Sequence, residues 1–418
     1  MARDLILGLA LMVSAAGCSR RKPIPADGGG PAVVVVDHRP GPEEIVEVEP
    51  NNDRAHAQRI ALGASVRGDI SNEKDVDIYS FTPSADGGTR TQVRITLTPN
   101  PTTDPSLEVV DAAGKRVLLV SDRGPGGSEV IPNLAVTVGA TYYLIVRRAF
   151  EPEERLGTTP SVSTYLLEVR PEPAPGVSEL EPNGDAKTAT VLSELGDVTG
   201  YFGWHRDDDW IKLPSTMGAD TTLRIELGPV DGVVASVRVE NGPTAVAEGR
   251  GVRGSEIRMR NVRIDGRLDT YVVLRGREGH NESNRWTLHL AIEPPVDGLE
   301  KEPNNTVGLA NPLIGPTAEV SGYLWPGDAD VFRVSGIPAG AVSDVEIEGV
   351  EHVDLKLERL SPGGESLGHA QTGGFGEGEK LTGVRSDGDL LIRVTARSGD
   401  TVFDAPYHLQ IRPGLEKK

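Results

Sequence analysis

A stretch of about 35 residues occurs three times in this chain, and this repetition limits the possible folds more than any other feature. The copies begin at Glu47, Glu179 and Glu300, and each opens with the pattern E-x-E-P-N. The proline is followed by a glycine 18, 18 and 19 residues later and by two aspartates 25 and 27 residues later in every copy, and the prolines themselves are 132 and 121 residues apart. A repeat of that length corresponds to a whole domain rather than to a solenoid unit. The repeated positions are Pro50, Gly68, Asp75 and Asp77; Pro182, Gly200, Asp207 and Asp209; and Pro303, Gly322, Asp328 and Asp330.

Length and composition agree with three domains of the all-β class. The 418 residues include 50 glycines and 31 prolines but only 4% aromatic residues, which is typical of many short strands joined by tight turns. The formal net charge of −19 argues against a nucleic-acid partner, because such proteins carry a basic face. A single cysteine, Cys18, excludes an intrachain disulfide.

The hydrophobic pattern predicts about eight strands in each copy and no long helix. Alternating apolar residues recur over short segments, and no segment keeps a 3.6-residue period for ten residues or more. We therefore predict three tandem jelly-roll-like β-sandwich domains, at 44–172, 173–297 and 298–418. In the first copy the predicted strands are 66–70, 76–81, 93–97, 106–110, 117–120, 130–134, 142–147 and 165–169.

The first 18 residues have the pattern of a secretory signal peptide. Residues 5–16 form an apolar run of 12, which is too short to span a bilayer. The sequence Ala15-Ala16-Gly17-Cys18 resembles a bacterial lipobox, and this resemblance implies a lipidated Cys18 (a palmitate-bearing anchor) and a membrane-tethered protein. Ser19 implies sorting to the cell outer membrane. The alternative is an ordinary signal peptide, in which case the protein is secreted.

Residues 19–43 are rich in proline and glycine and are expected to form a flexible linker. The apolar run at 33–36 either adds an edge strand to the first domain or belongs to that linker.

The three copies together resemble the bacterial pre-peptidase C-terminal domain, a family related to the collagen-binding domains of clostridial collagenases. The residues that carry the resemblance are E-x-E-P-N, the glycine about 18 residues later, the D-x-D that leads into a strand, and the Tyr-Tyr-Leu-Ile-Val run at Tyr142. It covers nearly all of residues 45–415. The family implies a β-sandwich and usually follows a protease on the same chain, and no protease segment is recognised here.

Strand alternation predicts that the paired aspartates of each copy point to one side. Two carboxylates at a sheet margin repel each other unless a cation neutralises them, and an oxygen-only set of ligands suits Ca²⁺ rather than zinc. The resemblance implies calcium ligands at matching positions in each copy. These are Glu47, Glu49, Asn51, Asn52, Asp75 and Asp77; Glu179, Glu181, Asn183, Asp207 and Asp209; and Glu300, Glu302, Asn304, Asn305, Asp328 and Asp330.

The metal hypothesis has two open points. In the second copy Gly184 replaces the second asparagine, which weakens the site only if that position binds through its side chain. The alternative interpretation of the motif is structural: Pro-Asn-Asn forms an Asx turn, and the aspartates cap loops or pair with arginines such as Arg67.

No catalytic constellation is evident, and we predict a protein that is not an enzyme. The eight histidines are scattered, and the G-x-S-x-G match at 364–368 falls in a predicted hairpin rather than at a strand-to-helix turn. The expected function is adhesion or binding of an extracellular polysaccharide or protein by a surface lipoprotein. The alternatives are a structural envelope spacer without a specific ligand, or an accessory to a secreted hydrolase.

Overall fold

The computed structural model describes residues 44–84, 90–149, 163–173, 175–386, 388–397 and 405–415. The chain divides into two compact units, Met1–Gly41 and Pro42–Lys418, and every described residue lies in the second. The predicted signal peptide, the lipidation site Cys18, the linker 19–43 and the run 33–36 therefore lie outside the described residues. Among the residues that are described, no helix has the length and apolar character needed to cross a membrane.

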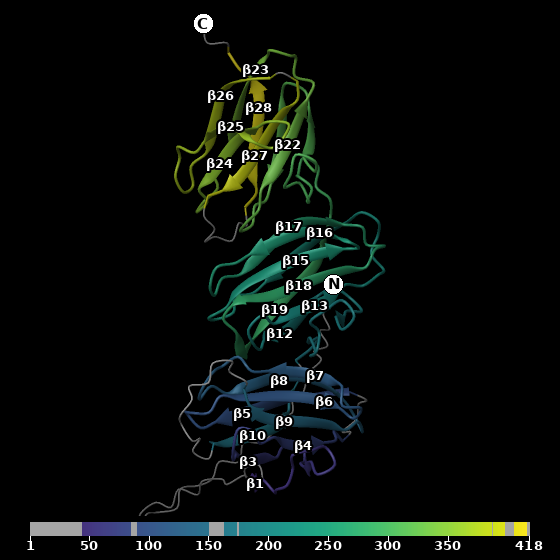
Figure 1. The fold of residues 1–418 in the computed structure, drawn as a ribbon. Coiled ribbons are helices and arrows are strands. Elements are labelled where there is room, and N and C mark those ends of the chain that lie inside the picture. The colour runs from purple at the N-terminus through teal and green to yellow at the C-terminus, as the bar shows by residue number, and fades with distance from the viewer. Residues whose placement is uncertain are drawn as a thin grey trace, which may run out of the picture. The chain divides into compact units, whose positions relative to one another are not determined.

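The first sandwich consists of ten strands in two five-stranded sheets (Figure 1). One sheet has the order β1-β3-β10-β5-β8 and the other β2-β4-β9-β6-β7. The short edge strands β1 and β2 run parallel to their partners β3 and β4, and all other pairs are antiparallel. The strands are β1 Glu44–Val46, β2 Gln58–Arg59, β3 Ser65–Ile70, β4 Asp77–Phe81, β5 Arg90–Pro99, β6 Pro105–Asp111, β7 Arg116–Val120, β8 Glu129–Thr137, β9 Tyr142–Arg148 and β10 Ser163–Pro171.

Strands β3 to β10 have jelly-roll connectivity, and they correspond one to one with the eight strands that the sequence predicts. Their two sheets read 3-10-5-8 and 4-9-6-7, so the chain passes between the sheets in nested Greek-key turns. The predicted fold class is thus confirmed. In this arrangement the short strands β1 and β2 form one edge of each sheet, so only a short stretch of unpaired backbone is exposed there.

The second sandwich repeats this plan, with sheets β12-β19-β14-β17 and β11-β13-β18-β15-β16. In place of β1, Ser178 forms an isolated parallel bridge with Thr199. The strands are β11 Thr190–Val191, β12 Asp197–Phe202, β13 Asp208–Lys212, β14 Thr221–Leu227, β15 Val234–Asn241, β16 Thr244–Arg250, β17 Ile257–Ile264, β18 Thr270–Glu278 and β19 Asn281–Glu293.

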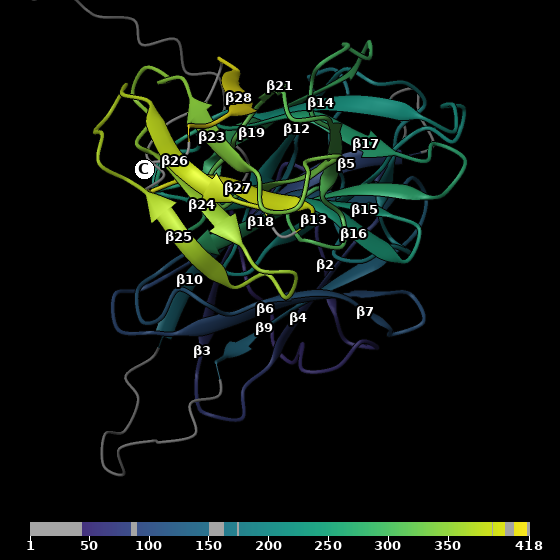
Figure 2. The same cartoon turned by 90° about the horizontal axis from the view of Figure 1, so that it is seen from above.

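The third sandwich has the same strand order again, with sheets β21-β28-β23-β26 and β20-β22-β27-β24-β25. Figure 2 shows β24 between β25 and β27, as the pairing requires. Gly364 lies in the β24–β25 hairpin, as predicted for the G-x-S-x-G match. The strands are β20 Asn311–Ile314, β21 Ala318–Gly322, β22 Asp330–Ser335, β23 Val342–Ile347, β24 Leu355–Leu360, β25 Ser366–Ala370, β26 Glu379–Arg385, β27 Leu390–Ala396 and β28 Tyr407–Pro413.

Each sandwich encloses its own core, because alternate side chains of both sheets point inward. In β10, for example, Tyr165, Leu167 and Val169 are buried, while the residues between them are more exposed. The first core combines such residues from β3, β5, β8 and β10 with those from β4, β6 and β9. Full burial of one Leu or Val side chain stabilises a fold by roughly 1.5–3 kcal/mol, so packing of this kind can support a domain without disulfides.

Candidate metal centres

Three of the four predicted acids of each copy converge at the start of the strand that carries the second aspartate (β4, β13 and β22). Two glutamates of the E-x-E-P-N segment and this aspartate each place a carboxylate oxygen within 4.8 Å of the other two. We call these clusters the first centre (Glu47, Glu49 and Asp77), the second centre (Glu179, Glu181 and Asp209) and the third centre (Glu300, Glu302 and Asp330).

The asparagine of E-x-E-P-N holds each centre together by the same hydrogen bonds. In Asn51, Asn183 and Asn304 the backbone N–H donates to the second glutamate at 2.8, 3.0 and 2.8 Å. Their side-chain amides donate to the first glutamate at 2.6, 2.8 and 3.1 Å. Their carbonyls accept from the residue after the second aspartate at 3.1, 3.2 and 3.1 Å, and the peptide bond before each proline is cis. The repeat is therefore preserved bond by bond.

An aromatic residue of the last strand completes each centre, and the sequence analysis did not assign it to the site. Tyr165, Trp286 and Tyr407 donate to the second aspartate at 2.6, 3.2 and 2.6 Å. The signal was present in the sequence, because each copy ends on a strand that carries an aromatic residue.

The repeated glycine is explained by the same aromatic residue. A Cβ at Gly68 would lie 2.4 Å from the Tyr165 ring, and one at Gly200 would lie 2.2 Å from both Trp286 and the Glu179 side chain. At Gly322 it would lie 2.2 Å from the Tyr407 hydroxyl. The glycine is thus required for space, since none of the three has a positive φ.

Several buried oxygens in these centres accept no hydrogen bond, and this is the feature that points to a ligand. The three asparagines are 0% exposed, and their Oδ1 atoms lack a donor. All of the unsatisfied atoms are acceptors, which is the state that a missing cation would leave. They are Oδ1 of Asn51, Asp77, Asn183, Asn304 and Asp330, Oε1 of Glu181 and Glu302, and Oδ2 of Asp328.

The charge of the centres is not balanced by basic side chains. Among the described ion pairs, none involves a carboxylate of the three centres. Two carboxylates about 5 Å apart repel each other by roughly 3 kcal/mol at an effective dielectric constant of about 20. Arg67, considered above as a partner for the aspartates, pairs with Glu44 at 2.8 Å instead.

Burial therefore shifts Asp77 and the carboxyl groups of the second and third centres toward the protonated form. Desolvation, with further contributions from the neighbouring carboxylates, raises the pKa of Asp77 to about 9. It also raises the pKa of every acid in the second and third centres well above its ordinary value. Such groups hold either protons or a metal ion at neutral pH.

The first aspartate of each pair lies beside its centre but is not one of the three converging carboxylates. Asp75, Asp207 and Asp328 are buried, and each caps the loop before its strand by accepting a backbone N–H at 2.6, 2.7 and 2.9 Å. Asp207 also interacts with Glu181, which keeps it within reach of the second centre.

The second asparagine of the motif lies further out. Asn52 is exposed, and the Asn305 amide nitrogen donates to Asp328 at 2.8 Å. Gly184, at the same position in the second copy, is exposed too.

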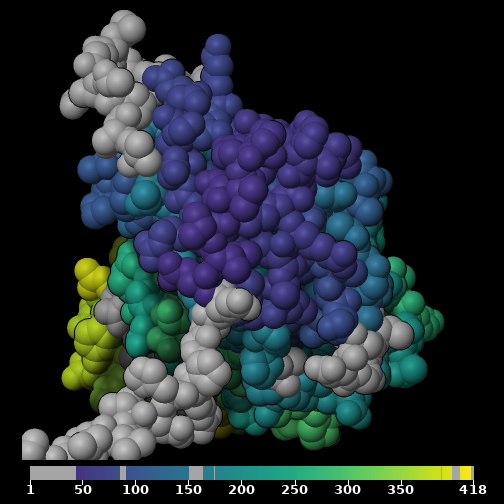
Figure 3. All heavy atoms as spheres, turned by 90° about the horizontal axis from the view of Figure 1, so that it is seen from below, coloured from purple at the N-terminus to yellow at the C-terminus, as the bar shows by residue number. Residues whose placement is uncertain are grey.

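The centres differ in exposure. Glu49 is exposed and Glu47 half-buried, whereas Glu181 and Glu302 are 2% and 1% exposed. The segment that opens the first sandwich, purple in Figure 3, lies at the surface of the face shown there.

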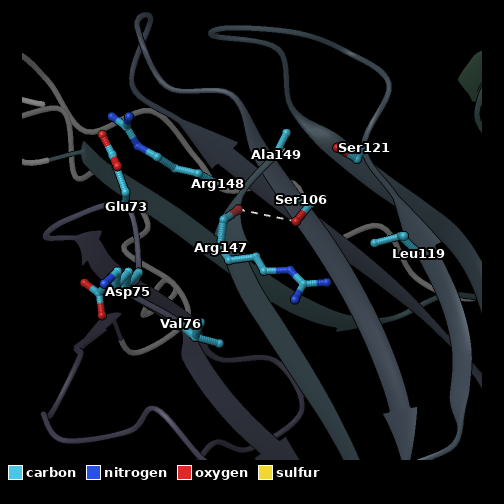
Figure 4. A pocket seen from close by; sticks show the side chains of 10 residues that line it. Glu73, Asp75, Val76, Ser106, Leu119, Ser121, Arg147, Arg148 and Ala149 are labelled. Atoms are coloured by element: carbon cyan, nitrogen blue, oxygen red, sulfur yellow. Dashed lines mark hydrogen bonds between the residues drawn. The ribbon is translucent and has the colours of Figure 1, made fainter. Parts of the chain in front are cut away.

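A groove with mixed polar and apolar lining lies next to Asp75 on the sheet that contains β4, β9 and β6 (Figure 4). It has a cavity volume of about 440 Å³, and Ser106 donates across it to the Arg147 carbonyl at 3.4 Å. The third sandwich has a groove of about 510 Å³ in the same place, beside Asp328. Basic and hydroxyl side chains in such a groove suit an acidic or hydroxyl-rich ligand. The basic residues are Lys74, Arg147 and Arg148 in the first groove and Lys356, Arg393 and Arg397 in the other.

Comparison with known proteins gives structural likenesses only. No protein-family model matches the chain. The search of curated proteins found no match either. The pre-peptidase C-terminal domain of a collagenase from Bacillus anthracis is 17% identical, with a TM-score of 0.21, over 27% of this chain and 94% of that one.

Two further solved structures cover more of the chain at lower identity. A chain from a triple jelly-roll turret assembly in an archaeal virus is 10% identical, with a TM-score of 0.17, over 81% of this chain and 82% of that one. The BSP domain of a biofilm-associated protein is 11% identical, with a TM-score of 0.15, over 89% of this chain and 69% of that one. The fold described above rests on the strand order of the chain itself.

Proposed function

We propose that the chain is a calcium-binding, non-enzymatic lipoprotein of the bacterial envelope whose tandem sandwiches bind extracellular or envelope polymers. The observation that carries the calcium part is the set of buried oxygens that lack a donor and recur at equivalent positions in three copies. A bound cation would satisfy these acceptors and remove the repulsion among the carboxylates.

The donor set fits calcium better than other common metals. Each centre offers two glutamates, one aspartate and one asparagine carbonyl oxygen, and it offers neither nitrogen nor sulfur for zinc. Magnesium keeps several waters in a strict octahedron, which a centre as buried as the second or third accommodates poorly. When bound, calcium would supply positive charge in place of the protons that the metal-free acids hold.

Metal analysis and calorimetric titration of soluble residues 40–418, which hold every described strand, test the calcium proposal. We expect up to three calcium ions per chain and weaker binding of magnesium. Asp209→Asn should remove one ion. Asp208→Asn is the matched control, because this neighbouring aspartate pairs with Arg275 outside the centre. Absence of calcium binding at millimolar concentration would refute the proposal.

Polymer binding is supported by the basic grooves and by the sequence resemblance to the pre-peptidase C-terminal domain. Glycan and matrix-protein arrays probed with residues 40–418, with and without calcium, test it. We expect the pair Arg147→Ala and Arg148→Ala to reduce binding. Arg170→Ala is the matched control, because it changes an arginine on the other sheet of the same sandwich.

The spacer alternative is favoured by one observation. Phe375, at 65% exposure, is the one exposed aromatic residue in the described part of the chain, whereas polymer-binding faces usually display several. Failure to bind any arrayed ligand, with calcium still bound, would favour a calcium-stabilised spacer.

Anchoring through Cys18 is the third part of the proposal, and it has a separate test. In the native host, the wild-type protein should fractionate with the outer membrane and incorporate labelled palmitate. Cys18→Ser should do neither and should appear in a soluble fraction. Equal fractionation of both proteins would favour secretion through an ordinary signal peptide.

A further inference from the structure

The second and third centres are each contacted by the preceding sandwich, and at both junctions an asparagine donates to the first glutamate, to its carboxylate and backbone at the second centre and to its backbone carbonyl alone at the third. Asn133 of β8 donates from its side chain to the carboxylate and the backbone carbonyl of Glu179. Asn261 of β17 donates to the Glu300 carbonyl. The preceding sandwich therefore supplies a hydrogen-bond donor to the first glutamate of each enclosed centre.

The second glutamate is also held by the preceding sandwich, through the backbone. Glu181 forms a parallel bridge with Leu134, in which the Ala135 N–H donates to the Glu181 carbonyl at 2.8 Å. Glu302 forms the same bridge with Val262, and the Arg263 N–H donates to its carbonyl at 3.2 Å. Both ligand-bearing segments thus add to an edge strand of the sandwich before them.

Each donor asparagine lies in a β-bulge, which explains how its side chain can leave the sheet. Asn133 is the second of two residues that face Arg94 across β5 and β8, and Asn261 is the second of two that face Arg224 across β14 and β17. The equivalent bulge in the third sandwich has Gly383, which is exposed.

Aromatic residues mark the same two junctions. After the repeated glycine the second and third copies have Tyr201 and Tyr323, and an arginine of the preceding sandwich lies over each ring, Arg94 at 5.3 Å (with Arg285, of the same sandwich as Tyr201, at 4.4 Å) and Arg260 at 4.9 Å. The first copy, which follows no sandwich among the described residues, has Asp69 there.

A tryptophan strengthens both contacts. Trp204 packs against the core of the first sandwich, and Trp325, at 2% exposure, belongs to the core cluster of the second. The second and third copies therefore share an aromatic pair at the junction, where the first copy has Asp69 and Asn72.

From this pattern we infer that the second and third centres are joints: Asn133 and Asn261 complete them from the preceding sandwich, so that cation binding and docking of neighbouring sandwiches are coupled. The inference rests on the calcium binding proposed above. If docking raises the calcium affinity by some factor, calcium must raise the docking equilibrium by the same factor. The first centre has no such partner among the described residues and binds independently.

The test isolates one centre at a time. In residues 40–418 carrying Asp77→Asn and Asp330→Asn, only the second centre keeps its full set of acids. Adding Asn133→Ala should weaken calcium binding there by about 10- to 100-fold, as loss of a group that orients a metal ligand usually does. Asn261→Ala should do the same at the third centre when the other two are disabled.

Docking is measured separately, as the distance between two labels attached to Lys115→Cys and Thr244→Cys. Both positions are exposed, and residues 40–418 contain no other cysteine because they lack Cys18. Calcium should narrow the distance distribution, and Asn133→Ala should broaden it again. Asn51→Ala is the matched control. It should weaken the first centre without changing the distribution.

The outcomes separate the two proposals. If calcium binds and Asn133→Ala changes neither the affinity nor the distance distribution, the joint is refuted and the calcium site stands. If the wild-type protein binds no calcium, both proposals fail. Circular dichroism and a cooperative unfolding transition establish that the variants are folded. If Asn133→Ala and Asn261→Ala have the same effect, a local folding defect in one variant cannot explain the result.

Discussion

The first centre and the two later ones are built from the same residues, yet they lie in different surroundings. Glu49 is exposed, whereas Glu181 and Glu302 are almost completely buried. The difference does not come from the motif, which is E-x-E-P-N in all three copies. It comes from the preceding sandwich, which contacts the second and third centres, whereas no described residue precedes Glu44 to contact the first in this way. The environment of a repeated site is thus set by its neighbour as much as by its own sequence.

Removal of calcium should produce the largest effect, because it acts on all three centres at once. Calcium at 100 times its dissociation constant stabilises a folded protein by about 2.7 kcal/mol per site, which corresponds to roughly 10 °C or more in a domain of this size. We expect EDTA to lower the melting temperature and excess calcium to raise it in differential scanning calorimetry. An unchanged midpoint under both conditions would contradict metal binding in any copy.

Gly200→Ala should be the most damaging single substitution, and it should be worse than Gly68→Ala. The new methyl group would collide with both Trp286 and Glu179 in the second copy, whereas in the first its nearest contacts all belong to Tyr165. Overpacking of this kind costs about 1–3 kcal/mol. Urea unfolding measures the loss, and calcium titration should show weaker binding only at the centre that was altered. Equal losses would indicate that the two centres are equally rigid.

Asp330→Asn should stabilise the fold in the absence of calcium and destabilise it in the presence of calcium. Without metal the wild-type carboxyl is a buried acid with a raised pKa, so a neutral amide should stabilise the fold at pH 8. With calcium the variant should be less stable than the wild-type protein, because it has lost a ligand. Destabilisation under both conditions would show that the wild-type aspartate is already stabilised without metal.

The metal-free protein should lose stability as the pH rises. Asp77 has a pKa of about 9 in the folded state and an ordinary value of 3.8 in the unfolded chain. The folded state therefore keeps a proton that the unfolded chain releases, so stability is greatest below about pH 4 and is lost up to about pH 9. Stabilisation by calcium should grow over the same interval. Unfolding at pH 5, 7 and 9 in calcium-free buffer checks this, and a stability that rises with pH would contradict it.

The smallest effect is expected at Asn52. Its side chain is exposed, and the second copy has a glycine at this position, so Asn52→Gly should change the calcium affinity of the first centre less than about threefold. Asn305→Gly should have a larger effect, because it removes the donor to Asp328. A large loss at Asn52 would show that this side chain binds the ion directly.

The sequence predicts the fold and the position of the centres well, because both depend on local patterns. Alternation at β10, with Tyr165, Leu167 and Val169 facing inward, is visible in the sequence, and so is the spacing that brings Asp77 to the start of a strand. The strand order 3-10-5-8 and 4-9-6-7 follows once eight strands must close as a jelly roll.

What the sequence does not predict is contact across long separations. Asn133 reaches a glutamate 46 residues later in the next sandwich, and nothing in the local pattern around it indicates a partner. The role of Tyr165 at the centre is hidden for the same reason, since its hydroxyl bonds an aspartate 88 residues earlier. The sequence also does not predict which of two adjacent asparagines is buried. Asn51 is buried and Asn52 is exposed, yet both have the same residue type and neighbouring positions in the motif.

The bulge asparagine also has a consequence for how such a gene can change. The first and second sandwiches both present an asparagine to whatever follows, and the second and third both present a tyrosine and a tryptophan to whatever precedes. In-frame loss of the middle module by unequal recombination would therefore join compatible ends, with Glu300 meeting the bulge asparagine Asn133. Duplication of the third module would instead place the tyrosine and tryptophan of the new copy against Gly383, which has no side chain to donate a hydrogen bond. We therefore expect arrays of this type to lengthen by duplication of inner modules and not at their carboxyl terminus.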